Sequence, residues 1–176
     1  KLLNKTKTGI ENTYKYNAYG KGLNPNKILN TYESHNQQLW VNTGNGLKLF
    51  DLQKLKFIPL PNIIGNNIFL TKDNVRAIKQ DKSNNFWFGT ESNGLFYYEV
   101  NTQSLKNYRN NPVLNSLPSN VIRDVFFYSD SELWIGTREG LSILNLETNQ
   151  FYNYVYDKYQ PHSLSHNSIR NFLRDD

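Results

Sequence analysis

The chain has 176 residues, of which 38% are hydrophobic and 14% aromatic, and its formal net charge is +5. It contains no cysteine, which excludes disulfide bonds, thiolate catalysis and cysteine-ligated metal sites, and which fits an oxidising compartment. The positive charge comes mostly from scattered lysines rather than from a block of like charges, so we expect no nucleic acid to contact this segment.

A repeat is evident from three tryptophans, Trp40, Trp87 and Trp134, which lie 47 residues apart. The stretches that contain them read LWVNTGNGL, FWFGTESNGL and LWIGTREGL. The same step relates one series of leucines and one of arginines: Leu23, Leu70, Leu117 and Leu164, and Arg76, Arg123 and Arg170. A fixed period of this length indicates a repeat architecture.

The repeat divides the chain into five segments. They are an incomplete unit at 1–18, complete units at 22–60, 69–108 and 116–156, and the first strand of another unit at 163–176. Leu2–Tyr16 corresponds to the end of a unit, because Asn4 lies 47 residues before Asp51. Ser168–Asp175 matches residues 74–81, which lead into the second tryptophan stretch. We therefore interpret the chain as part of a longer repeat protein.

Each complete unit reads as four strands. In the third unit they are expected at 120–128, 132–137, 140–146 and 151–156, because these runs are rich in β-branched and aromatic residues and are separated by turn residues. The pairs Asn45-Gly46 and Asn93-Gly94 fall between the second and third strands, where a tight hairpin requires positive φ.

The tryptophan strand is apolar on both faces, so neighbouring units should cover it on both sides. A four-stranded unit flanked by copies of itself is a propeller blade. We expect the tryptophans to be almost wholly buried, Gly89 and Gly136 to leave room for the next blade, and three leucines to pack beside the tryptophans: Leu47, Leu95 and Leu141. The predicted fold class is all-β, a β-propeller fragment with three complete four-stranded blades and partial blades at both ends.

Such a fragment leaves two apolar blade faces uncovered. We expect it to pair its ends with another copy, or to be the ordered part of a longer chain. The alternative is that the two ends meet and complete a fourth blade without a tryptophan strand.

The pattern Asn-x-Ile-Arg, followed about a dozen residues later by Leu-Trp-Ile-Gly-Thr-x-x-Gly-Leu, resembles the two-component regulator propeller repeat. The first copy departs from it, with Asn42 where the others have glycine. The resemblance implies an extracytoplasmic sensor on the periplasmic side of the inner membrane, in a membrane-anchored histidine kinase that is often a hybrid. It also implies an oligosaccharide input, a homodimeric receptor and transcriptional control of glycan-degrading genes as output. It implies no cofactor.

The arginine series falls on the strand expected nearest the propeller axis. Guanidinium groups there could hold an acidic sugar through bidentate contacts, whereas the plainer interpretation is that each arginine satisfies backbone carbonyls once per repeat. The candidate ligand-binding residues include this series, one further arginine in a turn, and planar side chains of the loop 154–166 that could stack on sugar rings: Arg76, Arg123, Arg170, Arg138, Tyr156, Tyr159 and His162. Pro112 and Pro118 stiffen the corresponding loop one repeat earlier.

Catalytic and metal-binding patterns are weak. His162 and His166 have the spacing of two ligands on a helix, but Pro161 before them indicates a loop, so we predict no metal site. Glu91 and Glu139 lie in turns and are expected to be solvated. We expect no catalytic residue in this segment.

Three function classes remain open at this stage. The first is a glycan-sensing part of a signalling receptor, together with the remaining blades of the same protein. The second is a propeller scaffold for protein partners or dimerisation without a small-molecule ligand. The third is an enzyme of the lyase-like propellers, which the shortage of histidines and clustered carboxylates disfavours.

Overall fold

The computed structural model describes residues 2–6, 9–14 and 27–174, with side chains from residue 27 onward. The expected start of the first complete unit and its Leu23 lie outside these ranges, as do residues 15–18 and 175–176. The chain divides into two compact units, Lys1–Asn74 and Val75–Asp176.

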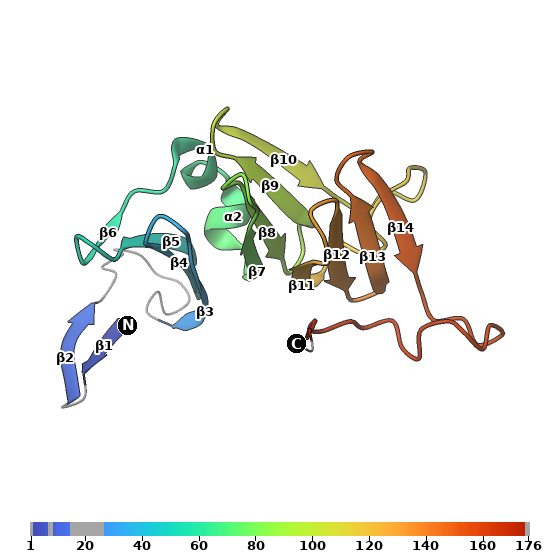
Figure 1. Cartoon of the computed structure of the whole chain (residues 1–176), viewed down its shortest axis with the longest axis horizontal. Helices are drawn as coiled ribbons and strands as arrows, with labels where there is room; N and C mark the ends of the chain where they lie inside the picture. Colours follow the sequence, from blue (N-terminus) through green and yellow to red (C-terminus); the bar gives the residue numbers. More distant parts are fainter. Residues whose placement is uncertain (1, 7–8, 15–26, 175–176) are drawn as a thin grey trace. The chain divides into compact units, whose positions relative to one another are not determined.

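The first unit contains an antiparallel hairpin and one four-stranded antiparallel sheet, which we call blade 1 (Figure 1). The hairpin is formed by β1 (Leu2–Thr6) and β2 (Gly9–Tyr14). Blade 1 comprises β3 (Ile28–Glu33), β4 (Gln38–Thr43), β5 (Gly46–Asp51) and β6 (Lys56–Ile58).

Two short helices follow blade 1, α1 (Asn62–Gly65) and α2 (Ile68–Lys72). The side chain of Asn67 accepts hydrogen bonds from the N–H groups of Phe69 and Leu70 and so begins α2. α2 packs against β5. No helix was expected here, but α1 and α2 have 4 and 5 residues, about one turn each, which is too short to contradict the all-β prediction.

The second unit contains two further antiparallel sheets, blade 2 and blade 3 (Figure 1). Blade 2 comprises β7 (Val75–Gln80), β8 (Phe86–Thr90), β9 (Leu95–Glu99) and β10 (Ser104–Tyr108). Blade 3 comprises β11 (Ile122–Phe127), β12 (Glu132–Thr137), β13 (Gly140–Asn145) and β14 (Gln150–Tyr154). Three four-stranded sheets, one per repeat, confirm the predicted all-β propeller class.

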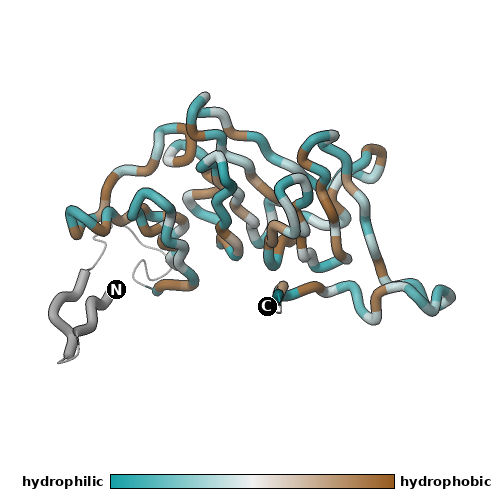
Figure 2. The backbone as a smooth tube through the Cα atoms, viewed as in Figure 1, coloured by the Kyte–Doolittle hydropathy of each residue, from teal (hydrophilic) through white to brown (hydrophobic). Residues whose placement is uncertain are grey.

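Each blade alternates apolar strand positions with polar turns, as Figure 2 shows along the tube. In blade 2 all five residues of the tryptophan strand β8 are buried, which is the two-sided covering that its sequence predicts. Trp40 and Trp87 are 2% and 3% exposed. Full burial of one tryptophan removes about 200 Å² from water, or roughly 5 kcal/mol of gross transfer free energy.

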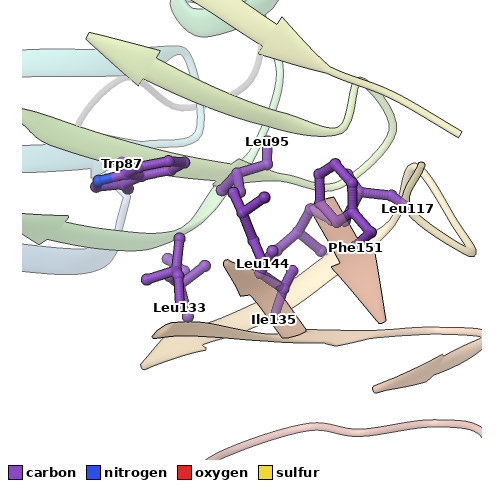
Figure 3. Close-up of a cluster of buried hydrophobic side chains, with 10 residues drawn as sticks. Trp87, Leu95, Leu117, Leu133, Ile135, Leu144 and Phe151 are labelled. Atoms are coloured by element: carbon purple, nitrogen blue, oxygen red, sulfur yellow. The ribbon is translucent and has the colours of Figure 1, made fainter. Parts of the chain in front are cut away.

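The core of the second unit lies between blades 2 and 3. Trp87 and Leu95 from blade 2 face Leu133, Ile135 and Leu144 from blade 3 (Figure 3). Leu117, from the loop between the two blades, is 1% exposed and belongs to the same cluster. The interface therefore uses the tryptophan face of one blade and the opposite face of the next.

Trp134 and Leu141 differ from their counterparts, because both are only half-buried whereas Leu47 and Leu95 are fully buried. They lie on the face of blade 3 that corresponds to the covered face of blade 2. Among the described residues, Phe172 reaches this face, with its ring centroid 6.2 Å from that of Trp134. The expectation of near-complete burial therefore fails for the third tryptophan.

The C-terminal segment does not form the strand expected within 163–176, since residues 155–174 are in no strand. It nevertheless occupies the position of the next repeat. The N–H of Ile169 donates to the carbonyl oxygen of Thr137 at 3.0 Å, and the N–H of Phe172 donates to the Asp124 carboxylate at 2.9 Å. A strand requires a partner strand to satisfy its backbone hydrogen bonds, and no described strand pairs with residues 155–174.

A threonine closes the turn between the second and third strands of every blade. The hydroxyls of Thr43, Thr90 and Thr137 donate to the carbonyl oxygens of Gly46, Gly94 and Gly140 at 2.8–2.9 Å. Each hydroxyl also accepts one backbone N–H from within the turn. The threonines are almost fully buried, so the conserved turn geometry of the repeat rests on satisfied polar groups.

Candidate functional site

The arginines of the innermost strands are placed by β-bulges. The register of β7 against β8 shifts between Val75 and Ala77, and that of β11 against β12 shifts between Ile122 and Asp124. Arg76 and Arg123 are therefore the extra residues of the two bulges. A bulge bends the strand and re-aims the side chain of its extra residue. Because β7 and β11 are neighbouring strands, the two arginines lie at the same end of adjacent blades.

Glu91 joins the two arginines. Its Oε2 pairs with Nε of Arg76, and its Oε1 lies 3.5 Å from Nη1 of Arg123. Glu91 follows Thr90 directly, so the closed turn after β8 holds it at the mouth of the blade. The side chains of Arg76, Glu91 and Arg123 are 38%, 33% and 25% exposed, which leaves the group within reach of solvent.

The electrostatics of this group show that its charges are close. Burial lowers the pKa of the Arg76 guanidinium, and the positive charge of Arg123 lowers it further. Glu91 offsets this repulsion. Glu91 is therefore not simply solvated as expected, because its carboxylate pairs with both arginines.

Arg138 and Arg170 occupy the corresponding positions one repeat later. Arg138 follows Thr137 as Glu91 follows Thr90, and its N–H donates to the carbonyl oxygen of Val121 at 3.1 Å. Arg170 follows Ile169, whose backbone is bonded to Thr137. Both arginines are exposed.

The other candidate residues lie in the loop that follows β14. The N–H of Tyr156 donates to Oδ1 of Asn167, which closes the base of the loop, and Ser163 exchanges hydrogen bonds with the backbone of Asp157. Tyr156 and Tyr159 are 48% and 77% exposed. His162 is also exposed and lines a cavity of about 620 Å³ at blade 3, together with five other side chains: Trp134, Leu141, Ile143, Tyr154 and Leu164.

The described part of the chain was also searched for metal-binding groups and for helices that could span a membrane. Within residues 27–174, no group of three or more histidine, aspartate or glutamate side chains is arranged to hold a metal ion. His162 and His166 lie in the loop and not on a helix. Of the helices in the described part of the chain, none has the length and apolar character needed to cross a membrane.

The architecture and the turn motif agree with a known repeat. Residues 70–92, which cover Leu70 to the turn after β8, match the family described as two component regulator propeller. This segment of 23 residues is therefore similar to a two-component regulator propeller repeat. Histidine kinase P4 of Formosa agariphila is 32% identical over 111 residues, which cover 61% of this chain and 8% of that protein.

Two solved structures have a similar fold. The extracellular domain of the hybrid two-component system BT3049 from B. thetaiotaomicron has a TM-score of 0.64 and 23% identity over 86% of this chain and 21% of its own. The extracellular domain of the one-component system BT4673 from the same organism has a TM-score of 0.64 and 25% identity over 85% and 19% of the two chains. The chain thus spans about a fifth of these relatives, and the likeness shows the fold.

Several functional features escaped the sequence reasoning. The ion pairs of Glu91 cross from one blade to the next, so no local pattern announces them. A signal existed in the alignment of the repeats, where Glu91 and Arg138 stand at the same position with opposite charge. The bulges that aim the arginines leave no residue signature of their own.

Proposed function

We propose that this chain is part of the extracytoplasmic sensor region of a two-component histidine kinase, where it takes part in the binding of oligosaccharides released from a glycan. The output would be transcription of polysaccharide-utilisation genes. In this proposal the intact receptor is anchored in the inner membrane, faces the periplasm and dimerises, while these blades perform no catalysis and use no cofactor.

The observation that carries the proposal is the combination of the repeat match at residues 70–92 with exposed cationic and aromatic side chains at one end of blade 3. Functional residues of propellers lie on the loops that a rigid frame presents. Here the frame is the blade, and the turn after β12 and the loop after β14 present arginine, tyrosine and histidine side chains.

A test uses the 176-residue chain and a panel of defined oligosaccharides, with calorimetric titration as the measurement. Binding of one class of saccharide, reduced by Tyr156→Ala, supports the proposal. The matched control is Tyr152→Ala, because Tyr152 is similarly exposed, at 51%, but lies on β14. An absence of binding by every saccharide would argue for the second candidate.

The second candidate is a scaffold that holds protein partners without a small molecule. The half-buried apolar face of blade 3, with its cavity of about 620 Å³, favours it, because such a face is suited to covering by another polypeptide. Sedimentation measurements at increasing concentration check this candidate, since self-association that ends when Leu141→Lys is introduced would support it.

A further inference from the structure

Blade 3 lacks a counterpart of the Glu91 carboxylate, which pairs with two arginines at blade 2. In blade 2, the position after the turn threonine holds Glu91, which lies between the bulge arginines Arg76 and Arg123. One step of 47 residues later, the three corresponding positions hold Arg123, Arg138 and Arg170. A carboxylate flanked by two guanidinium groups is thus replaced by three guanidinium groups.

The backbone around the three arginines repeats that of blade 2. The hydroxyls of Thr90 and Thr137 close their turns at 2.9 and 2.8 Å, so Glu91 and Arg138 leave matching turns. Ile169 lies against Gly136 as Ile122 lies against Gly89, and Arg170 follows Ile169 as Arg123 follows Ile122. The hydrogen bond of 3.0 Å from Ile169 to Thr137 holds this placement.

In the described region, no acidic side chain takes the role of Glu91 beside Arg138 and Arg170. Among residues 27–174, neither Arg138 nor Arg170 is in an ion pair. Asp124, beside Arg123 in sequence, already accepts the backbone N–H groups of Val125 and Phe172, at 2.8 and 2.9 Å. Arg123 is shared with Glu91 at the long distance of 3.5 Å, so it retains donors for another acceptor.

We propose that Arg123, Arg138 and Arg170 form a binding site for an oxyanion, the carboxylate or sulfate group of an acidic saccharide. Guanidinium groups present donors in a planar fork that matches both oxyanions, and a bound anion would take the place that the Glu91 carboxylate has in blade 2. The assignment to a saccharide rests on the proposed function, whereas the oxyanion site itself does not.

An aromatic side chain stands beside this position. The backbone of Tyr154 and the side chain of Val155 lie against Gly140, in the turn that carries Arg138. Tyr156 follows, and its N–H is bonded to Asn167, three residues before Arg170. The ring of Tyr156 is half-exposed, so it is available to stack on a sugar that bears the anionic group.

The test titrates the 176-residue chain with sodium sulfate, trigalacturonate and maltotriose at constant ionic strength. We expect saturable sulfate binding, tighter binding of trigalacturonate, and at least tenfold weaker binding of the neutral maltotriose. Arg138→Glu restores the arrangement of blade 2 and should weaken both anions by at least tenfold. Arg109→Glu makes the same charge change at an exposed arginine between blades 2 and 3 and should leave binding within twofold.

The outcomes separate two claims: that the three arginines bind an oxyanion, and that this oxyanion belongs to a saccharide. Sulfate binding that is equal in Arg138→Glu and the parent chain, or absent from the parent, overturns the oxyanion site. Sulfate binding that Arg138→Glu abolishes, without binding of trigalacturonate, supports the site and overturns its assignment to a saccharide. Equal affinity for trigalacturonate and maltotriose overturns the oxyanion site while leaving saccharide binding in place. Far-UV circular dichroism confirms that Arg138→Glu is folded, and its melting temperature without anion should exceed that of the parent.

Discussion

Ile122 rests directly on Gly89 of the preceding blade, so that a Cβ atom at residue 89 would stand 2.6 Å from Cγ2 of Ile122 and 3.1 Å from its Cβ. No L-amino acid with a side chain fits there without movement of β11 against β8. The close spacing of blades 2 and 3 thus requires glycine at position 89. The same spacing brings Arg123, the residue after Ile122, close to Glu91.

Gly89→Ala should destabilise the chain by about 1–3 kcal/mol, because the added methyl group overpacks a closed interface. Urea unfolding followed by circular dichroism measures the change. The control is Gly65→Ala at the end of α1, where the nearest atom to an added Cβ is 3.7 Å away. Equal destabilisation by both substitutions would contradict this account of the interface.

Thr137→Val should cost about 1–3 kcal/mol of unfolding free energy, because it leaves a buried carbonyl oxygen and a backbone N–H without the hydroxyl that serves both. Thr137→Ser keeps the hydroxyl and should lose much less. The comparison is made by chemical denaturation, and a serine variant as unstable as the valine variant would show that packing of the methyl group, rather than the hydroxyl, stabilises the turn.

Trp87→Ala should cost about 3–5 kcal/mol, as for other large buried side chains. Trp134→Ala should cost clearly less, since Trp134 is half-buried and its face is covered only in part. Thermal and urea unfolding of the two variants provide the comparison. Equal losses would mean that the face of blade 3 is as fully packed in solution as that of blade 2.

Acid sensitivity should depend on Asp51. The Lys54 backbone N–H donates to its carboxylate and lowers its pKa from the ordinary 3.8, with smaller lowering by the Lys54 ammonium and the Gln53 N–H. Because the folded pKa lies below the unfolded value, this stabilisation is present above pH 3.8 and is lost as the pH falls through the folded pKa.

Asp51→Asn should therefore keep the turn but lose this dependence, because Asn145 accepts the corresponding two N–H bonds in blade 3. Urea unfolding between pH 2 and 6 measures the effect. Asp130→Asn, at a 75% exposed carboxylate, is the control. If the unfolding free energy of Asp51→Asn depends on pH as that of the parent chain does, Asp51 is not the source of the acid sensitivity.

The repeat made most of the fold predictable from sequence, because the residues that define strands, turns and buried tryptophans recur at one spacing. The helices α1 and α2 were not predicted. α2 begins at a cap by Asn67 that occurs in one repeat only, and α1 follows Pro61 without a side-chain cap. The half-burial of Trp134 and the lack of strand structure at residues 155–174 were not predictable from the motif either. Both depend on which neighbour covers blade 3, whereas the motif describes a blade between two others.

The candidate site was predictable in part. The arginine series and the loop after β14 were found from spacing and composition, whereas the bridging role of Glu91 required the three-dimensional contact between β7, β11 and the turn after β8. The opposite charges of Glu91 and Arg138 can be interpreted only once the ion pairs of Glu91 are known.

The central claim is that the residue after the turn threonine determines whether the two arginines beside it are neutralised by a carboxylate of the chain or are open to an anion. Glu91→Arg tests it most directly, because it gives blade 2 the three guanidinium groups of blade 3. Calorimetric titration with sulfate should then show two binding sites in place of one. A stoichiometry that stays at one site in a folded Glu91→Arg chain would contradict the claim.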